Sequence, residues 1–372
     1  MVRKPSLMLM VIMLMVPQIV ETIYSPALRS IADTFAVTPL QAAQTLSIYF
    51  IAFAIGVVFW GITADKYGRR PAMLLGLFIY SCATLTALVT EHFYVVMLAR
   101  AASAFGIAVG SVVTQTMLRD SFSGEELGKV FSLMGMGISI SPVIGMALGG
   151  QLVLQAGYQA VFATLFILAI MLLGYNGLKL PETRQTRQPL QLSWLGKTMF
   201  KDSQIWCSAT LVATFNIALF AYYQLGGFVF EKLGYSVQEF GYSGLVLGIG
   251  TLFGSYCNKA LLARKVDQSK LLSLATALLT IGSIGVYFLN HSIWFLVPML
   301  LVVMAFGIAI PNVLSTALLN YRQHVGSAGA LLGLMYYLII GVGLAVAGII
   351  QHLGTVLVVC ALLTIVARSL KR

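Results

Sequence analysis

The chain has 372 residues, of which 59% are hydrophobic and only 9% are charged, whereas soluble domains carry about 25% charged residues. This composition excludes a soluble globular protein, because too much apolar surface would face water, and it predicts an integral membrane protein. The net charge of +11 does not indicate nucleic-acid binding, since no basic domain lies outside the apolar segments.

Twelve apolar runs follow one another along the chain, each of about 17 to 25 residues, which suits membrane-spanning helices and not barrel strands. The first run carries Glu21 and has no small-x-small cleavage site, so we interpret it as a retained helix and not as a signal peptide. The runs cover approximately residues 6–28, 42–63, 72–90, 93–117, 129–152, 158–179, 204–226, 238–260, 269–289, 292–316, 326–349 and 351–368.

The longest polar stretch divides these runs into two sets of six. We therefore predict an all-α integral membrane fold with twelve transmembrane helices in two pseudo-symmetric six-helix bundles, residues 1–180 and 204–372, joined by a cytoplasmic linker at 181–203. A short internal repeat supports the division: the pattern Gly-x-x-x-Asp-Lys that begins at residue 61 is similar to the pattern Gly-x-x-x-Asn-Lys that begins at residue 254. Repeats of this kind are typical of transporters whose site lies between the two halves.

The basic residues predict the orientation of the chain. Most of the 23 Lys and Arg residues occur at the termini or in the loops after even-numbered runs, and the opposite side holds only Arg29 and Lys232. By the positive-inside rule, both termini are cytoplasmic. We expect a multi-pass protein of the bacterial inner (cytoplasmic) membrane.

The loop after the second run has the pattern G-x-x-x-D-[RK]-x-G-R-[RK], which is unusual for a passive connection. Asp65 can accept hydrogen bonds from a helix N-terminus, such as the one near Gly326 and Ser327, and Arg69 can pair with Asp120 at the end of the fourth run. Turn glycines and positive-inside charge would explain Lys66 and Arg70 without function, but not Asp65. We assign a gating role to Gly61, Asp65, Lys66, Gly68, Arg69, Arg70 and Asp120.

Only two charged residues fall deep inside predicted spans, Glu21 in the first and Arg100 in the fourth. Each costs at least ~2.5 kcal/mol near the centre of a lipid-exposed helix, so such residues usually face a cavity or a partner. Both lie at a similar depth, and a carboxylate that gains and loses its proton beside an arginine can couple proton flow to transport. The structural alternatives are a buried ion pair that locks two helices and a Glu near the interface that snorkels. We assign proton coupling to both residues.

Aromatic and amide side chains in the spans suggest a wide pocket for apolar ligands. Most such residues in helical membrane proteins only pack or form interfacial belts, which is the alternative for each. The candidate substrate-binding residues are Gln18, Tyr49, Gln115, Phe215, Asn216, Tyr222, Tyr223 and Tyr336.

No pattern of residues indicates catalysis or a cofactor. The acids are too sparse for a hydrolytic site, and the four histidines lie at loop positions without the spacing of metal ligands. We expect neither an enzyme nor a metal site, and no bound cofactor.

The sequence resembles the drug:proton antiporter branch of the major facilitator superfamily, and within it the bicyclomycin and chloramphenicol resistance group. The resemblance implies a twelve-helix exporter that expels hydrophobic or cationic compounds and is driven by inward proton flow. It rests on the Gly61–Arg70 loop, Tyr24-Ser25-Pro26-Ala27, Arg100 with Gly106, Arg119-Asp120, Pro181-Glu182-Thr183, the Tyr222–Tyr235 region, Pro311-Asn312 and the stretch from Gly326 to Gly329.

The chain departs from this group at several positions. The group often has an acid where this chain has Thr22, and here the acid is the preceding residue, Glu21. Ser103 and Ala104 replace a usual Gln and Gly, and Met146 stands where a proline is common. These departures concern the proton site and the substrate range more than the fold.

We therefore predict a proton-coupled antiporter that exports hydrophobic or cationic drugs by alternating access, with a small-molecule substrate, protons and the lipid bilayer as partners and no nucleic acid. We expect a monomer. One alternative is the export of a single endogenous metabolite, such as a siderophore or an amino acid, for which Arg100 would anchor an anionic cargo. Another is a transport-inactive membrane receptor or scaffold.

Overall fold

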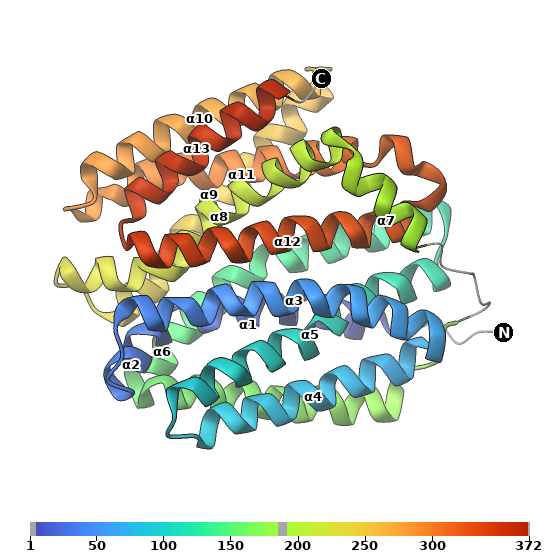
Figure 1. Ribbon diagram of the computed structural model, residues 1–372, viewed down its shortest axis with the longest axis horizontal. Coiled ribbons are helices and arrows are strands. Elements are labelled where there is room, and N and C mark those ends of the chain that lie inside the picture. Colours follow the sequence, from blue (N-terminus) through green and yellow to red (C-terminus); the bar gives the residue numbers. More distant parts are fainter. Residues whose placement is uncertain (1–4, 185–191, 371–372) are drawn as a thin grey trace.

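The computed structural model describes residues 5–184 and 192–370, and every regular element in that part of the chain is a helix (Figure 1). Part of the predicted linker, residues 185–191, lies outside the described residues. The first half consists of α1 (Leu7–Ile23), α2 (Ala27–Thr34), α3 (Pro39–Tyr67), α4 (Arg69–Val89), α5 (Phe93–Ser121) and α6 (Gly124–Lys179). The second half consists of α7 (Leu192–Lys201), α8 (Ser203–Lys232), α9 (Val237–Ala263), α10 (Gln268–Leu289), η1 (Ile293–Phe295), α11 (Leu296–Ala317), η2 (Leu319–His324), α12 (Val325–Ile350) and α13 (Leu353–Leu370).

The described helices match the twelve predicted spans once two breaks are recognised. Ten of them are long and apolar enough to cross a membrane, and the pair α1 and α2, bent by 50°, forms an eleventh span. The 56-residue helix α6 is interrupted at Ala156 and Gly157, whose backbone angles are not helical. Gly157 has φ +64, a conformation that glycine adopts without a steric penalty. α6 therefore supplies two spans, the fifth and the sixth.

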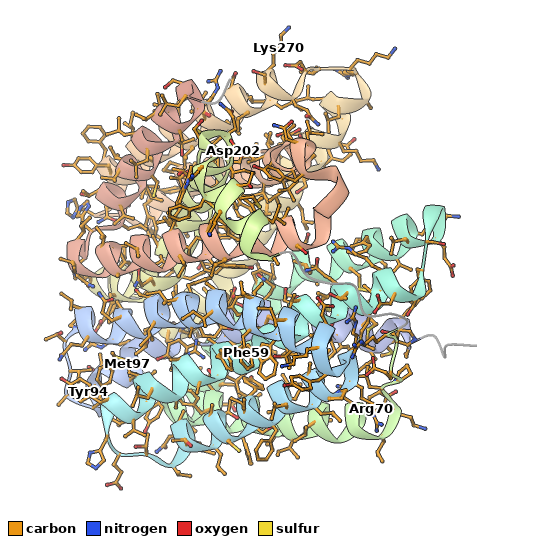
Figure 2. All side chains as sticks on the ribbon, turned by 45° about the vertical axis from the view of Figure 1, so that its right-hand side comes forward. Phe59, Arg70, Tyr94, Met97, Asp202 and Lys270 are labelled. Carbon is orange, nitrogen blue, oxygen red and sulfur yellow. The ribbon has the colours of Figure 1, made fainter. Side chains whose placement is uncertain are left out.

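The two halves lie one above the other in Figure 1 and meet along two pairs of helices, α3 with α12 and α6 with α9. We call the end of the molecule that carries residues 61–70 the loop end, and the opposite end the far end. Figure 2 places Arg70 and Tyr94 at these opposite ends of the first half.

The contacts between the halves are concentrated toward the far end. A Cβ added to Gly241 of α9 would lie 2.9 Å from the Cα of Gly150 in α6, and one added to Gly341 of α12 would lie 2.4 Å from the Ile51 side chain of α3. Small residues of this kind let two helices approach closely. The halves are thus tightly packed at the far end.

Candidate functional site

Asp65, Arg69 and Asp120 form a cluster at the loop end, which we call the loop-end cluster, and Arg69 links its two acids. Its guanidinium Nε lies 2.9 Å from Oδ2 of Asp120, and Nη1 lies 2.8 Å from Oδ1 of Asp65 and 2.9 Å from the carbonyl oxygen of Ala64. The predicted pair of Arg69 and Asp120 is therefore present, joining α4 to α5. The partner that we expected for Asp65, the start of α12, includes side chains at 322–326 that lie outside the described residues.

Glu182, which follows α6, caps the first turn of α4. Its Oε1 accepts a hydrogen bond from the backbone N–H of Arg69 and its Oε2 from that of Arg70, each at 3.0 Å. Partial burial raises the pKa of this carboxyl, but hydrogen bonds from the backbone N–H groups of Arg69, Arg184, Arg70 and Thr183 outweigh it and leave the pKa below its ordinary value of 4.5. Because α4 has no side-chain cap of its own, Glu182 replaces one.

This cap explains one of the two glycines in the loop motif. Gly68 has φ +115, and a Cβ there would lie 2.6 Å from Oε2 of Glu182. Gly61 differs, since its Cβ would meet only a Val112 methyl at 3.8 Å, an ordinary contact. Gly68 is thus required by the backbone and by the cap, whereas Gly61 is not.

The end of α6 and the residues after it form further hydrogen bonds with the loop-end cluster and its neighbours. The Thr183 hydroxyl donates to Asp120 at 3.2 Å, and Arg184 Nη1 donates to the carbonyl of Lys66 at 3.0 Å. Arg70 in turn donates to the carbonyl of Gly177 at 2.6 Å. The sequence analysis did not predict these contacts. An acid just after α6 was the signal in the sequence, but it does not show which helix the acid caps.

Glu21 and Arg100 are both buried, each with 1% of its surface exposed. Neither oxygen of Glu21 has a hydrogen-bond partner in the described part of the chain, and neither do Nε and Nη2 of Arg100. The two side chains interact electrostatically but form no ion pair. The guanidinium carbon of Arg100 instead lies 3.8 Å from the ring centre of Tyr24 and 4.5 Å from that of Tyr49, within cation–π range.

Aromatic side chains from both halves gather around Glu21. The phenols of Tyr49 in α3, Tyr223 in α8, and Tyr336 and Tyr337 in α12 lie near enough for the charge of Glu21 to act on them, without a hydrogen bond to its oxygens. Three of these four are among the candidate substrate-binding residues, and the fourth, Tyr337, is the sequence neighbour of Tyr336. Glu21 thus lies where the first half faces the second, which is where transporters built from two repeats place their site.

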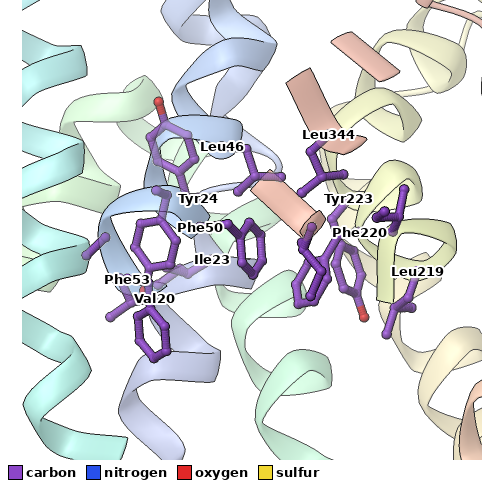
Figure 3. Close-up of a cluster of buried hydrophobic side chains, with 14 of the residues drawn as sticks. Val20, Ile23, Tyr24, Leu46, Phe50, Phe53, Leu219, Phe220, Tyr223 and Leu344 are labelled. Carbon is purple, nitrogen blue, oxygen red and sulfur yellow. The ribbon is translucent and has the colours of Figure 1, made fainter. Parts of the chain in front are cut away.

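Figure 3 shows the apolar part of this meeting point, where Phe50 of α3 faces Phe220 of α8. Their ring centres are 4.5 Å apart, and the ring centres of Phe53 and Tyr337 are 5.0 Å apart. These phenylalanines extend the aromatic surface beyond the predicted residues. The helical spacing of aromatic residues at positions 49, 50 and 53 was the signal for the two phenylalanines of α3.

Other predicted substrate residues are placed differently. Tyr222 points into the second half, where its hydroxyl is 2.5 Å from that of Ser243. Asn216 donates to a carbonyl of its own helix at 2.7 Å, and Phe215 is buried in the hydrophobic core. The remaining two, Gln18 and Gln115, are half-buried.

The far end is held by polar contacts that sequence reasoning did not assign. Arg29 of α2 lies 2.7 Å from Glu231 of α8, so an ion pair joins the halves there. Ser25 donates a short hydrogen bond to the carbonyl of Tyr223. Arg29 was one of only two basic residues predicted on that side, and this rarity was the available signal.

Gln224 of α8 crosses between the halves as well. It is fully buried, and its Nε2 donates to the carbonyls of Ala43 in α3 at 2.9 Å and Leu344 in α12 at 3.0 Å. Its third acceptor is the hydroxyl of Ser47, at 3.3 Å. One side chain therefore ties three helices together near the far end.

The family model described as the Major Facilitator Superfamily matches residues 10–367, nearly the whole chain. The chain belongs to the major facilitator superfamily. It is accordingly a multi-pass membrane transporter and not an enzyme. Solved structures with the same fold include a D-xylose-proton symporter, with a TM-score of 0.76 over 96% of each chain at 15% identity.

Another solved structure with the same fold is a bacterial homologue of the human lysosomal transporter Spinster, in an inward-facing and unoccupied conformation. Its TM-score is 0.75 at 15% identity, over 98% of this chain and 95% of that one. Among relatives in sequence, Multidrug resistance protein D of Escherichia coli is 28% identical over 89% of this chain and 85% of its own length. The Bicyclomycin resistance protein homolog of Haemophilus influenzae is 27% identical over 87% of this chain and 83% of its own. These relatives confirm the resemblance noted in the sequence.

Proposed function

We propose that this superfamily member is a proton-coupled antiporter that exports hydrophobic or cationic drugs, with Glu21 as the proton carrier. The observation that carries the proposal is the placement of Glu21, buried between the halves with both carboxyl oxygens unpartnered. A charged carboxylate without hydrogen bonds is costly away from water, and a bound proton or a cationic substrate removes that cost. Proton and substrate then compete for one group.

The contacts at the far end support alternating access. Gln224 and the Arg29–Glu231 pair join the two halves there. Opening the far end requires these contacts to break while contacts form at the loop end, where the cluster around Arg69 lies. With the termini and the loop end in the cytoplasm, as the basic residues indicate, a transporter held shut at the far end is in the part of the cycle that receives substrate from the cell.

Transport by purified protein in liposomes tests the proposal. An imposed proton gradient should drive tetraphenylphosphonium, a lipophilic cation, against its own gradient, and Glu21→Gln should abolish this coupled movement. Glu91→Gln makes the same chemical change at an exposed position and should leave transport intact. The proposal fails if Glu21→Gln transports with an unchanged dependence on the proton gradient.

A second function, export of an anionic or zwitterionic metabolite, is favoured by one observation. Nε and Nη2 of Arg100 are buried donors without acceptors, and a substrate carboxylate would satisfy them. If this cargo is the true one, amino acids and siderophore-like acids will compete for binding and Arg100→Lys will weaken them more than it weakens tetraphenylphosphonium. The opposite order of effects supports the drug exporter.

A further inference from the structure

The stretch between the halves contains a helix, α7, that has two different faces. Leu195 and Met199, four residues apart, are 2% and 1% exposed and belong to one hydrophobic cluster with Ala328 and Leu332 of α12. Residues at this spacing share one side of a helix. That side of α7 is therefore fixed against the second half.

The remaining side of α7 is exposed and carries a distinct chemistry. Lys197 and Lys201 are exposed, and the ring of Phe200 has 66% of its surface exposed. Together with Gly196 they line a shallow surface depression. Like charges four residues apart repel each other and weaken a helix, and an anion bound between them would reverse this effect.

The position of α7 places this side at the surface of the bilayer. α7 ends at Lys201, and the membrane-spanning α8 begins two residues later at Ser203. Asp202 stabilises the junction between α7 and α8, because its carboxylate accepts hydrogen bonds from the N–H of Gln204 at 2.9 Å and from the hydroxyl of Tyr321 at 2.8 Å.

Trp206, in the first turn of α8, marks the level of the interface. Its ring N–H donates to the carbonyl of Phe200 at 2.8 Å, and the two ring centres are 5.1 Å apart. Tryptophan is enriched at the height of the lipid headgroups. The exposed ring of Phe200 is thus held beside the upper acyl chains, while the ammonium groups lie at headgroup height.

We propose that α7 binds the headgroup of an anionic phospholipid, with Lys197 and Lys201 at the phosphate and Phe200 against the acyl chains. Two cations beside an exposed aromatic ring match an anionic lipid, whereas a free phosphate ion would gain nothing from the ring. The lipid contacts a helix that packs on α12, which also carries Tyr336. This surface is separate from Glu21 and does not depend on the proposed transport function.

Native mass spectrometry of the full-length protein in detergent, titrated with phosphatidylglycerol or phosphatidylcholine, tests this inference. Replacing both lysines in Lys197→Gln/Lys201→Gln should lower the phosphatidylglycerol affinity roughly thirtyfold, equivalent to about 2 kcal/mol at 1 kcal/mol per lysine. Phosphatidylcholine binding should not change. Phe200→Ser should weaken both lipids, and inorganic phosphate should displace neither.

A matched control removes the same charge elsewhere. Lys265→Gln/Lys270→Gln changes two exposed lysines, one in the turn between α9 and α10 and one in the first turn of α10, and should change the affinity less than about threefold. Lys270 is labelled in Figure 2. Equal losses in the two double variants would overturn the proposal, because the lipid would then respond only to net charge. Displacement by inorganic phosphate, or an absence of preference for phosphatidylglycerol in the unaltered protein, would overturn it too.

Discussion

Replacing Gly68 by alanine tests how the loop motif is held. The substitution places a Cβ at φ +115 and within 2.6 Å of Oε2 of Glu182. The backbone conformation, with ψ 160, is one that only glycine adopts readily, at a cost of about 1–3 kcal/mol for other residues. The displaced carboxylate also loses its role as a cap, which adds about 1 kcal/mol. We expect Gly68→Ala to lower the free energy of unfolding by about 2–4 kcal/mol.

A double-mutant cycle separates these two contributions. In a Glu182→Ala background there is no carboxylate to displace, so Gly68→Ala should cost only the backbone strain, and the two substitutions should couple by about 1 kcal/mol. Denaturant unfolding in detergent measures the free energy of unfolding of the unaltered protein, the two single variants and the double variant. Gly61→Ala is the control, since its Cβ meets an ordinary contact at 3.8 Å, and it should be neutral or slightly stabilising. Additive costs in the cycle would refute the contact between Gly68 and Glu182.

Two further predictions concern other contacts. Gln224→Leu removes a donor to Ala43, Ser47 and Leu344, so the closed far end should lose about 1–3 kcal/mol of stabilisation. Distances between spin labels placed across the far end should lengthen, and an unchanged distance distribution would contradict the role of Gln224. Because the folded pKa of Glu182 lies below 4.5, its stabilisation is present above pH 4.5 and is lost as the pH falls through the folded value. Thermal unfolding of the unaltered protein and Glu182→Gln should therefore differ at neutral pH and converge in acid; a constant difference would argue against this linkage.

The sequence was sufficient for the fold because hydrophobic length and basic loops are local signals. It also indicated the pair of Arg69 and Asp120, since charges at the ends of apolar segments need partners. The cap by Glu182 was not predictable in the same way, because 112 residues separate that acid from Arg70 and only the fold brings them together.

Neighbouring aromatic residues show a second limit of sequence reasoning. Tyr222 and Tyr223 are adjacent in one helix, and adjacent side chains point about 100° apart. Tyr222 consequently bonds to Ser243 inside the second half, whereas Tyr223 interacts with Glu21. Composition identified both as candidates, and only the packing of α8 distinguishes them.

The internal repeat differs in charge between the halves. Where the first half has Asp65, Arg69 and Asp120, the corresponding helices of the second half, α9 and α11, are joined by a neutral bond of 2.6 Å from Asn312 to Asn258. Amide contacts are indifferent to ionic strength and acidity, while ion pairs respond to both. Salt and acid should therefore weaken the contacts of Arg69 with Asp65 and Asp120, and they should leave the contact between Asn312 and Asn258 unchanged.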